Sequence, residues 1–72
     1  MDKINAKIPQ KNEKYVVKII DYGSNGEGIA KIDGFTVFVP FSLIGEEVEI
    51  LIVQAKKDFA FGKVLNVINS SK

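Results

Sequence analysis

The sequence predicts an all-β protein, folded as a small antiparallel barrel of five strands. Most of its 72 residues fall into short runs rich in Val, Ile, Phe and Tyr, which favour strands. Residues 46–55 alternate between apolar and polar side chains, the pattern of a half-buried strand. The pair Asp33-Gly34 separates two apolar runs and is a strong signal for a two-residue hairpin. No stretch shows the period of an amphipathic helix.

The expected strands are separated by residues that favour turns. Gly23, Gly26 and Gly28 place a loop after the first strand. Pro40 ends the third strand because it cannot donate a hydrogen bond to a ladder. Residues 41–45 are expected to form a compact connection with one helical or 3₁₀ turn. The five expected strands cover residues 14–22, 29–32, 35–39, 46–55 and 59–68.

The chain is long enough for one domain with a thin core. A domain of this size buries only about 60% of the surface that its unfolded chain exposes. Five short strands cannot cover both faces of a two-sheet sandwich, whereas a closed barrel removes exposed edges and encloses one apolar layer. We therefore expect an OB-like or SH3-like barrel over residues 14–68. Residues 1–13 are expected to be a flexible leader, and residues 69–72 a polar tail or a linker to a missing domain.

The composition argues against several classes of function. The chain has neither cysteine nor histidine. We therefore expect no disulfide, no metal site, and neither the usual general base nor the usual strong nucleophile. No apolar run approaches the roughly 20 residues that span a bilayer, and no secretory signal is present. The expectation is a cytoplasmic protein with no membrane partner and no catalytic residue.

Alternation along the third and fifth strands assigns the phenylalanines to faces. A narrow barrel favours small and branched side chains inside. Phe38, Phe59 and Phe61 are then left on the exterior. The alternative is that these rings belong to the core, because Phe is usually buried. The side chains expected to point inward are Val37, Val39, Ala60, Val64 and Ile68.

An exterior that combines phenylalanine rings with lysines has the composition of a surface for single-stranded nucleic acid. Stacking of a base on an aromatic ring contributes about 1–3 kcal/mol and tolerates any base. Lysines neutralise phosphates and make binding depend on salt. The net charge of +1 is far from strongly basic, so we expect a modest affinity. The expected contact residues are Phe38, Phe59 and Phe61, Phe35 as a support at the hairpin exit, and Lys31, Lys56, Lys57 and Lys63.

The glycine-rich loop permits two interpretations. Its Gly-x-x-Gly-x-Gly spacing reverses the dinucleotide-binding fingerprint, and no helix pattern follows it, so a Rossmann site is rejected. Bare backbone amides there could approach a phosphate, but Glu27 would oppose an anion. We favour a purely structural turn in which the glycines shape the chain.

Together these features resemble the TRAM domain. The similarity rests on Gly26, Gly28 and Ala30, then Val39-Pro40, then Gly45-Glu46, and it covers about residues 14–68. Each element is weak alone, but their order and spacing together are quite specific. The resemblance implies a five-stranded OB-like barrel that binds RNA.

The pattern is most similar to the N-terminal TRAM domain of bacterial 23S ribosomal RNA uracil-5-methyltransferases. In such enzymes, cysteines for an iron–sulfur cluster and an S-adenosylmethionine-dependent domain follow the TRAM domain. The resemblance therefore implies a non-catalytic monomeric domain that grips ribosomal RNA for a catalytic domain attached in cis, with no cofactor of its own.

Two other functions stay open at this point. One is a stand-alone RNA-binding protein or RNA chaperone, which would use the same surface without an enzyme. The other is an SH3-like module that holds a peptide against the aromatic side chains. The dependence of affinity on salt concentration distinguishes the peptide-binding module from the RNA-binding functions. RNA binding weakens steeply as salt is added, whereas peptide binding in an apolar groove does not.

Overall fold

The computed structural model describes residues 9–70 and contains six strands and no helix within them. This confirms the all-β prediction. No helix among these residues could cross a membrane. The strands are β1 (Lys14–Lys18), β2 (Asp21–Tyr22), β3 (Gly28–Ile32), β4 (Phe35–Val39), β5 (Glu47–Ala55) and β6 (Phe59–Asn69).

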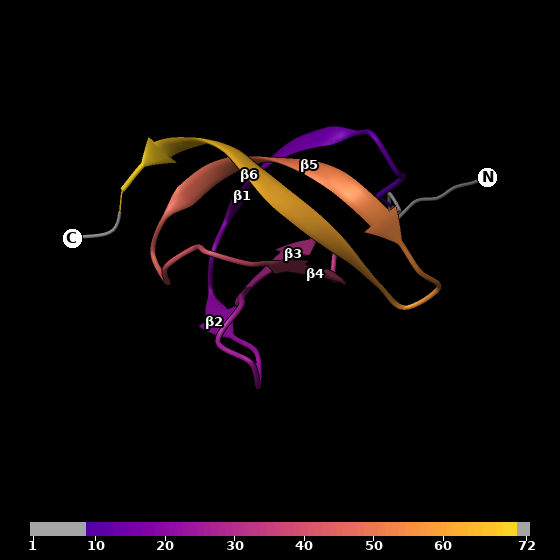
Figure 1. The fold of residues 1–72 in the computed structure, drawn as a ribbon, viewed down its shortest axis with the longest axis horizontal. Coiled ribbons are helices and arrows are strands. Elements are labelled where there is room, and N and C mark those ends of the chain that lie inside the picture. The colour runs from indigo at the N-terminus through magenta and orange to yellow at the C-terminus, as the bar shows by residue number, and fades with distance from the viewer. Residues whose placement is uncertain (1–8, 71–72) are drawn as a thin grey trace.

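All six strands lie in one curved sheet of order β1-β5-β6-β4-β3-β2, in which β5 and β6 arch over β3 and β4 (Figure 1). Only Ile19 and Ile20 separate the two edge strands, β1 and β2. Ile19 exchanges backbone hydrogen bonds of 2.9 Å with Gly45 and Glu46, beside β5. Ile20 donates to the carbonyl of Ile29 on β3 at 2.8 Å. One segment therefore provides both edges, and the sheet is compatible with a small OB-like barrel although, within residues 9–70, β1 and β2 do not pair with each other to close it.

The sheet differs from the expected five antiparallel strands in three details. Residues 14–22 form two strands because the chain turns at Ile19 from β5 to β3. The pair β4–β6 is parallel, since a connection through β5 brings β6 back in the direction of β4. Residues 41–45 form turns and no helical turn.

Positive backbone angles explain the tight hairpin between β3 and β4. Asp33 has φ of 51° and Gly34 has φ of 85°, the two positive values that a type I′ turn requires. Ile32 pairs directly with Phe35, so the loop contains two residues as predicted. The Asp-Gly signal therefore fixed the register of these two strands.

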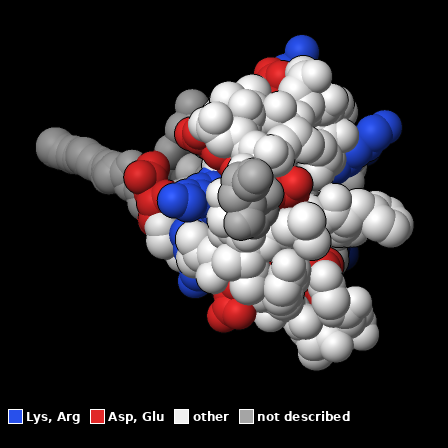
Figure 2. All heavy atoms as spheres, turned by 90° about the vertical axis from the view of Figure 1, so that its left-hand side faces the viewer, with Lys and Arg blue, Asp and Glu red and all other residues white. Residues whose placement is uncertain are grey.

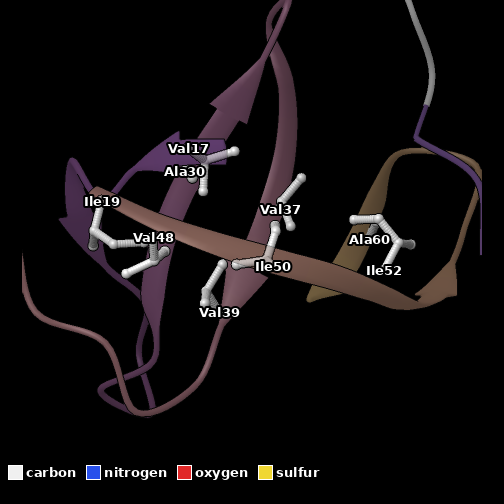
Figure 3. Close-up of a cluster of buried hydrophobic side chains, with 9 residues drawn as sticks. All are labelled: Val17, Ile19, Ala30, Val37, Val39, Val48, Ile50, Ile52 and Ala60. Atoms are coloured by element: carbon white, nitrogen blue, oxygen red, sulfur yellow. The ribbon is translucent and has the colours of Figure 1, made fainter. Parts of the chain in front are cut away.

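Nine buried aliphatic side chains form the core, and Figure 3 shows them pointing toward one another between β5 and the strands that face it. The alternation predicted for β5 is confirmed, because Val48, Ile50 and Ile52 are fully buried. The core consists of Val17, Ile19, Ala30, Val37, Val39, Val48, Ile50, Ile52 and Ala60.

The prediction of which β6 side chains point into the barrel is correct for the first part of the strand and wrong at its end. Ala60 is buried and Val64 packs against the core, but Ile68 is 52% exposed. The pairing with β4 ends at Phe61, so the last residues of β6 have β5 beside them and no facing layer. Register shifts along the β5–β6 pair also disturb the alternation there.

Part of the predicted leader packs onto the barrel. Pro9 is fully buried. Asn12 donates to the carbonyl of Ile52 at 2.7 Å, and Ile52 donates to that of Glu13 at 2.8 Å. Tyr15 donates its hydroxyl to Glu13 Oε1 at 2.5 Å. This bond, with burial and nearby negative charge, raises the pKa of Tyr15 to about 12. Residues 1–8 and 71–72 of the predicted leader and tail lie outside the described residues.

Candidate nucleic-acid interface

The outer face of β4 and β6 gathers three aromatic side chains. The parallel register pairs Phe38 with Phe61 and Thr36 with Phe59, which places the three rings on one side of the sheet. Their centroids lie 5.5–5.7 Å apart, with two of the three pairs edge-to-face. Each ring is half-buried because its neighbours shield one side of it. We call Phe38, Phe59 and Phe61 the aromatic cluster.

Phe35, the fourth predicted aromatic contact, lies apart from this cluster. It precedes Phe38 by three residues and so points to the opposite face of β4. It pairs with Ile32, and both side chains pack against the core. Phe35 therefore supports the barrel from within rather than extending the outer surface.

The four predicted lysines lie on strands or in a turn next to the aromatic cluster. Lys31 lies on β3 directly opposite Thr36, on the outer face. Lys63 follows Phe61 by two residues and shares its face. Lys56 and Lys57 lie in the β5–β6 turn, where the Lys56 amide donates to the carbonyl of Phe59 at 2.8 Å. All four side chains are exposed.

Sequence reasoning missed Phe41, the most exposed aromatic residue of the described chain. Its side chain is fully solvent-accessible, at 101% of the reference area, and its φ is 64°. Among residues 9–70, the other non-glycine residues with positive φ are Asn12 and Asp33, types that visit this region readily. A phenylalanine there is strained, and such strain often marks a functional position. The available signal was an aromatic residue placed directly after Pro40, in a connection with no strand to bury it.

Hydrogen bonds fix the β4–β5 loop that carries Phe41. The buried hydroxyl of Ser42 donates to the carbonyl of Val39 at 2.6 Å. The Leu43 amide donates to Glu46 Oε1 at 2.8 Å. The Ile44 amide donates to the Tyr22 hydroxyl at 3.1 Å, which links the loop to β2. The loop therefore holds the Phe41 ring out into solvent.

Two hollows flank Phe41, and both reach Phe61. The larger, about 870 Å³, lies between the β2–β3 and β4–β5 loops and includes Tyr22, Glu27 and Phe38 in its lining. The smaller, about 430 Å³, lies toward β5 and β6, where Lys63 contributes to its wall. Aromatic surfaces thus continue from one hollow across Phe41 to the other.

The glycines of residues 23–28 shape the chain, as the sequence favoured. Gly26 has φ of 83°, which a side chain would strain. A Cβ on Gly28 would lie 2.0 Å from Ser42 Oγ and 3.1 Å from the Val39 carbonyl oxygen. The absence of a side chain at Gly28 therefore lets the two loops that wall the larger hollow approach each other.

The end of the molecule on which the β4–β5 loop lies is mostly uncharged (Figure 2). Figure 2 views the end of the molecule that includes this loop, and most of the face is uncharged, with scattered basic and acidic groups. Among residues 9–70, no group of His, Cys, Asp or Glu side chains could hold a metal ion. The surface offers aromatic faces with a few cations at their margins, which suits a ligand with flat rings and spaced negative charges.

Comparisons with known proteins agree with this geometry. Residues 10–65 match the TRAM domain family. A Clostridium tetani protein named "Uncharacterized RNA methyltransferase" is 47% identical over 62 residues, which is 86% of this chain and 14% of that protein. A Clostridium acetobutylicum protein of similar name is 46% identical over 63 residues, 88% of this chain and 14% of its own length. The chain thus spans about one seventh of these relatives.

A small solved structure is also similar. The solution structure of a conserved protein from Methanococcus maripaludis superposes with a TM-score of 0.74 at 39% sequence identity. The match covers 78% of this chain and 80% of that protein. The barrel therefore also occurs in a chain that extends little beyond it.

Proposed function

Because the chain belongs to the TRAM domain family, we propose that it binds single-stranded RNA through the outer face of β4 and β6 and catalyses no reaction itself. The observation that carries this proposal is the aromatic cluster, with Phe41 exposed beside it and lysines at its margins. Unpaired bases stack on such rings, and the lysines contact the phosphates between them.

The charges set the expected strength of binding. Four lysines border the surface, and each phosphate that one neutralises on a single strand contributes about −0.7 to the slope of log affinity against log salt. A net charge of +1 provides little long-range attraction beyond these contacts. We therefore expect modest affinity for RNA from this barrel alone.

Within a longer protein, we propose that the barrel positions RNA for an attached S-adenosylmethionine-dependent RNA uracil-5-methyltransferase acting on ribosomal RNA in the cytoplasm. Relatives named RNA methyltransferases, of which the match covers 14%, support this proposal. The attached domain would supply the methyl donor and any iron–sulfur cluster. Tethering would raise the effective concentration of RNA at that domain, so even weak binding by the barrel contributes.

A stand-alone RNA-binding protein is the second candidate. The similarity to a small protein of Methanococcus maripaludis, 80% of which is covered, favours it. The same outer face would then bind RNA without delivering it to an enzyme. The two candidates share their surface and differ in whether a catalytic domain is attached.

Titration of RNA into the barrel tests the shared part of the proposal. We expect a double variant, Phe59→Ala with Phe61→Ala, to bind a fluorescent single-stranded RNA at least tenfold more weakly than the parent chain. Val16→Ala is the matched control, because Val16 is 57% exposed on β1 and lies away from the aromatic cluster. Backbone amide spectra verify the fold of each variant. If the folded double variant binds as tightly as the parent, the proposed surface is wrong.

A further inference from the structure

An acidic residue, Glu27, is among the residues that line the larger hollow. Glu27 is half-buried in the β2–β3 loop and lines this hollow together with Tyr22 and residues of the β4–β5 loop. The loop is closed by the Gly23 amide, which donates to the Glu27 carbonyl at 2.7 Å. The carboxylate lies against Gly23, where a Cβ would be 2.7 Å from Glu27 Oε1. Glycine at that position thus leaves the acidic group room against the backbone of its own loop.

The carboxylate retains capacity to accept hydrogen bonds. The Asn25 amide donates to Glu27 Oε1 at 3.0 Å, and no other hydrogen bond to this carboxylate arises within residues 9–70. Two carboxylate oxygens accept about four hydrogen bonds in total. No lysine lines this hollow. A phosphate would be repelled there, whereas a ligand edge with N–H donors would be attracted.

Charge is distributed unequally along the surface. Lys31 lies toward the hairpin end of β3, and Lys56 and Lys57 lie in the β5–β6 turn. Lys63 lines the smaller hollow, whereas Glu27 directly precedes the opposite end of β3 and lines the larger one. Figure 1 shows the β2–β3 loop and the β5–β6 turn well apart in the molecule. Among residues 9–70, Glu27 is the only charged residue that lines the larger hollow, so this hollow favours a base edge over a phosphate.

The four RNA bases differ in what they offer to a carboxylate. Guanine presents N1–H and N2–H side by side and can donate to both oxygens at once. Uracil presents one N–H between two carbonyl oxygens, which the carboxylate repels. Adenine and cytosine each present one amino group beside an unprotonated ring nitrogen. Only guanine gives a bidentate match to a carboxylate on its Watson–Crick edge.

We propose that the larger hollow is a guanine-binding subsite for single-stranded RNA, in which Glu27 accepts N1–H and N2–H of the base. Phe38, Phe41 and Phe61 line the hollow and would provide the stacking surface for the purine ring. This inference rests on the proposed RNA binding and adds to it a preference for one base at one position. The rest of the surface stays tolerant of sequence.

A comparison of the affinities of short oligonucleotides for the unmodified chain tests the subsite. The probes are a seven-nucleotide uridine run and the same run with one central guanosine, titrated by fluorescence anisotropy at fixed salt. A bidentate contact to a base predicts a preference of about 5- to 150-fold for the guanosine probe. Inosine lacks N2–H and should lose most of this preference, whereas 7-deazaguanosine keeps the Watson–Crick edge and should retain it.

Two matched variants separate the carboxylate from overall charge. Glu27→Gln should bind the two probes within twofold of each other. Glu49→Gln removes the same charge from β5, where Glu49 accepts a hydrogen bond from Asn66, and should keep the preference. If Glu27→Gln does not fold, the inosine and 7-deazaguanosine series on the parent chain decides the question alone.

The outcomes distinguish this inference from the proposed function. Equal binding of both probes by the parent chain, or a preference that survives in folded Glu27→Gln, overturns the guanine subsite and leaves RNA binding intact. Absence of binding to either probe overturns the proposed function, and the subsite with it.

Discussion

Replacing Phe41 with glycine should weaken RNA binding while the fold becomes no less stable. The side chain is fully exposed, so its removal forfeits almost no buried apolar surface. Its φ of 64° costs an ordinary side chain about 1–2 kcal/mol, which glycine does not incur. The greater freedom of glycine in the unfolded chain costs roughly 0.4–1 kcal/mol. The difference lies between no change and about 1.5 kcal/mol of added stability, or up to about 10 °C in Tm.

The loss of affinity follows from the lost ring. One stacking partner contributes about 1–3 kcal/mol, which corresponds to a 5- to 150-fold rise in Kd. Thermal unfolding by circular dichroism measures the first effect, and anisotropy with single-stranded RNA measures the second. Phe41→Tyr is the control, because it keeps both the ring and the strained backbone and should bind within about twofold of the parent chain.

The distinctive result for Phe41→Gly is weaker RNA binding together with an unchanged or higher free energy of unfolding. A residue kept for the fold would lose stability when removed, and its loss of binding would follow from unfolding. If Phe41→Gly unfolds more easily by over 1 kcal/mol, the strain argument fails. If the folded variant binds RNA as the parent does, Phe41 is not part of the interface.

Three further predictions follow from other parts of the barrel. Gly28→Ala should destabilise the fold by about 3 kcal/mol, measured by urea unfolding, because the new Cβ overlaps Ser42 Oγ and displaces its buried hydrogen bond; an unchanged midpoint would contradict the close approach. Tyr15 is held neutral in the folded state, so its contribution to stability is complete below pH 10 and is lost between pH 10 and about 12. Tyr15→Phe should lose less stability over that interval, and parallel curves for the two proteins would refute the assignment. A double change of Lys31 and Lys63 to alanine should lower the salt slope of RNA binding by about 1.4, and an unaltered slope would show that neither contacts phosphate.

Local patterns in the sequence predicted much of the architecture because each had one physical solution. Asp33-Gly34 permits the positive φ values of a tight hairpin, which sets the register of β3 and β4. The two-residue period of residues 47–52 leaves only one face apolar enough to be buried. The same alternation placed Phe38 on the outer face, opposite the buried Val37 and Val39.

The remaining features depend on contacts between distant parts of the chain. Residues 14–22 read as one strand because no turn residue marks the break at Ile19 and Ile20, which arises from pairing with both β5 and β3. Ile68 is of a residue type that is usually buried. It is exposed because β6 stops pairing with β4 at Phe61, well before Ile68. Phe41 is conspicuous through its φ and exposure, and neither can be read from residue types.

Chemical-shift mapping of the barrel with a short single-stranded RNA tests the central claim most directly. The account predicts that the largest amide and aromatic shifts occur at the aromatic cluster and Phe41, with smaller shifts at Lys31 and Lys63. Shifts confined to β1 and the neighbouring face of β5, around Val16 and Glu49, would place the interface elsewhere. A spectrum that stays unchanged in a large molar excess of RNA would contradict RNA binding by this chain.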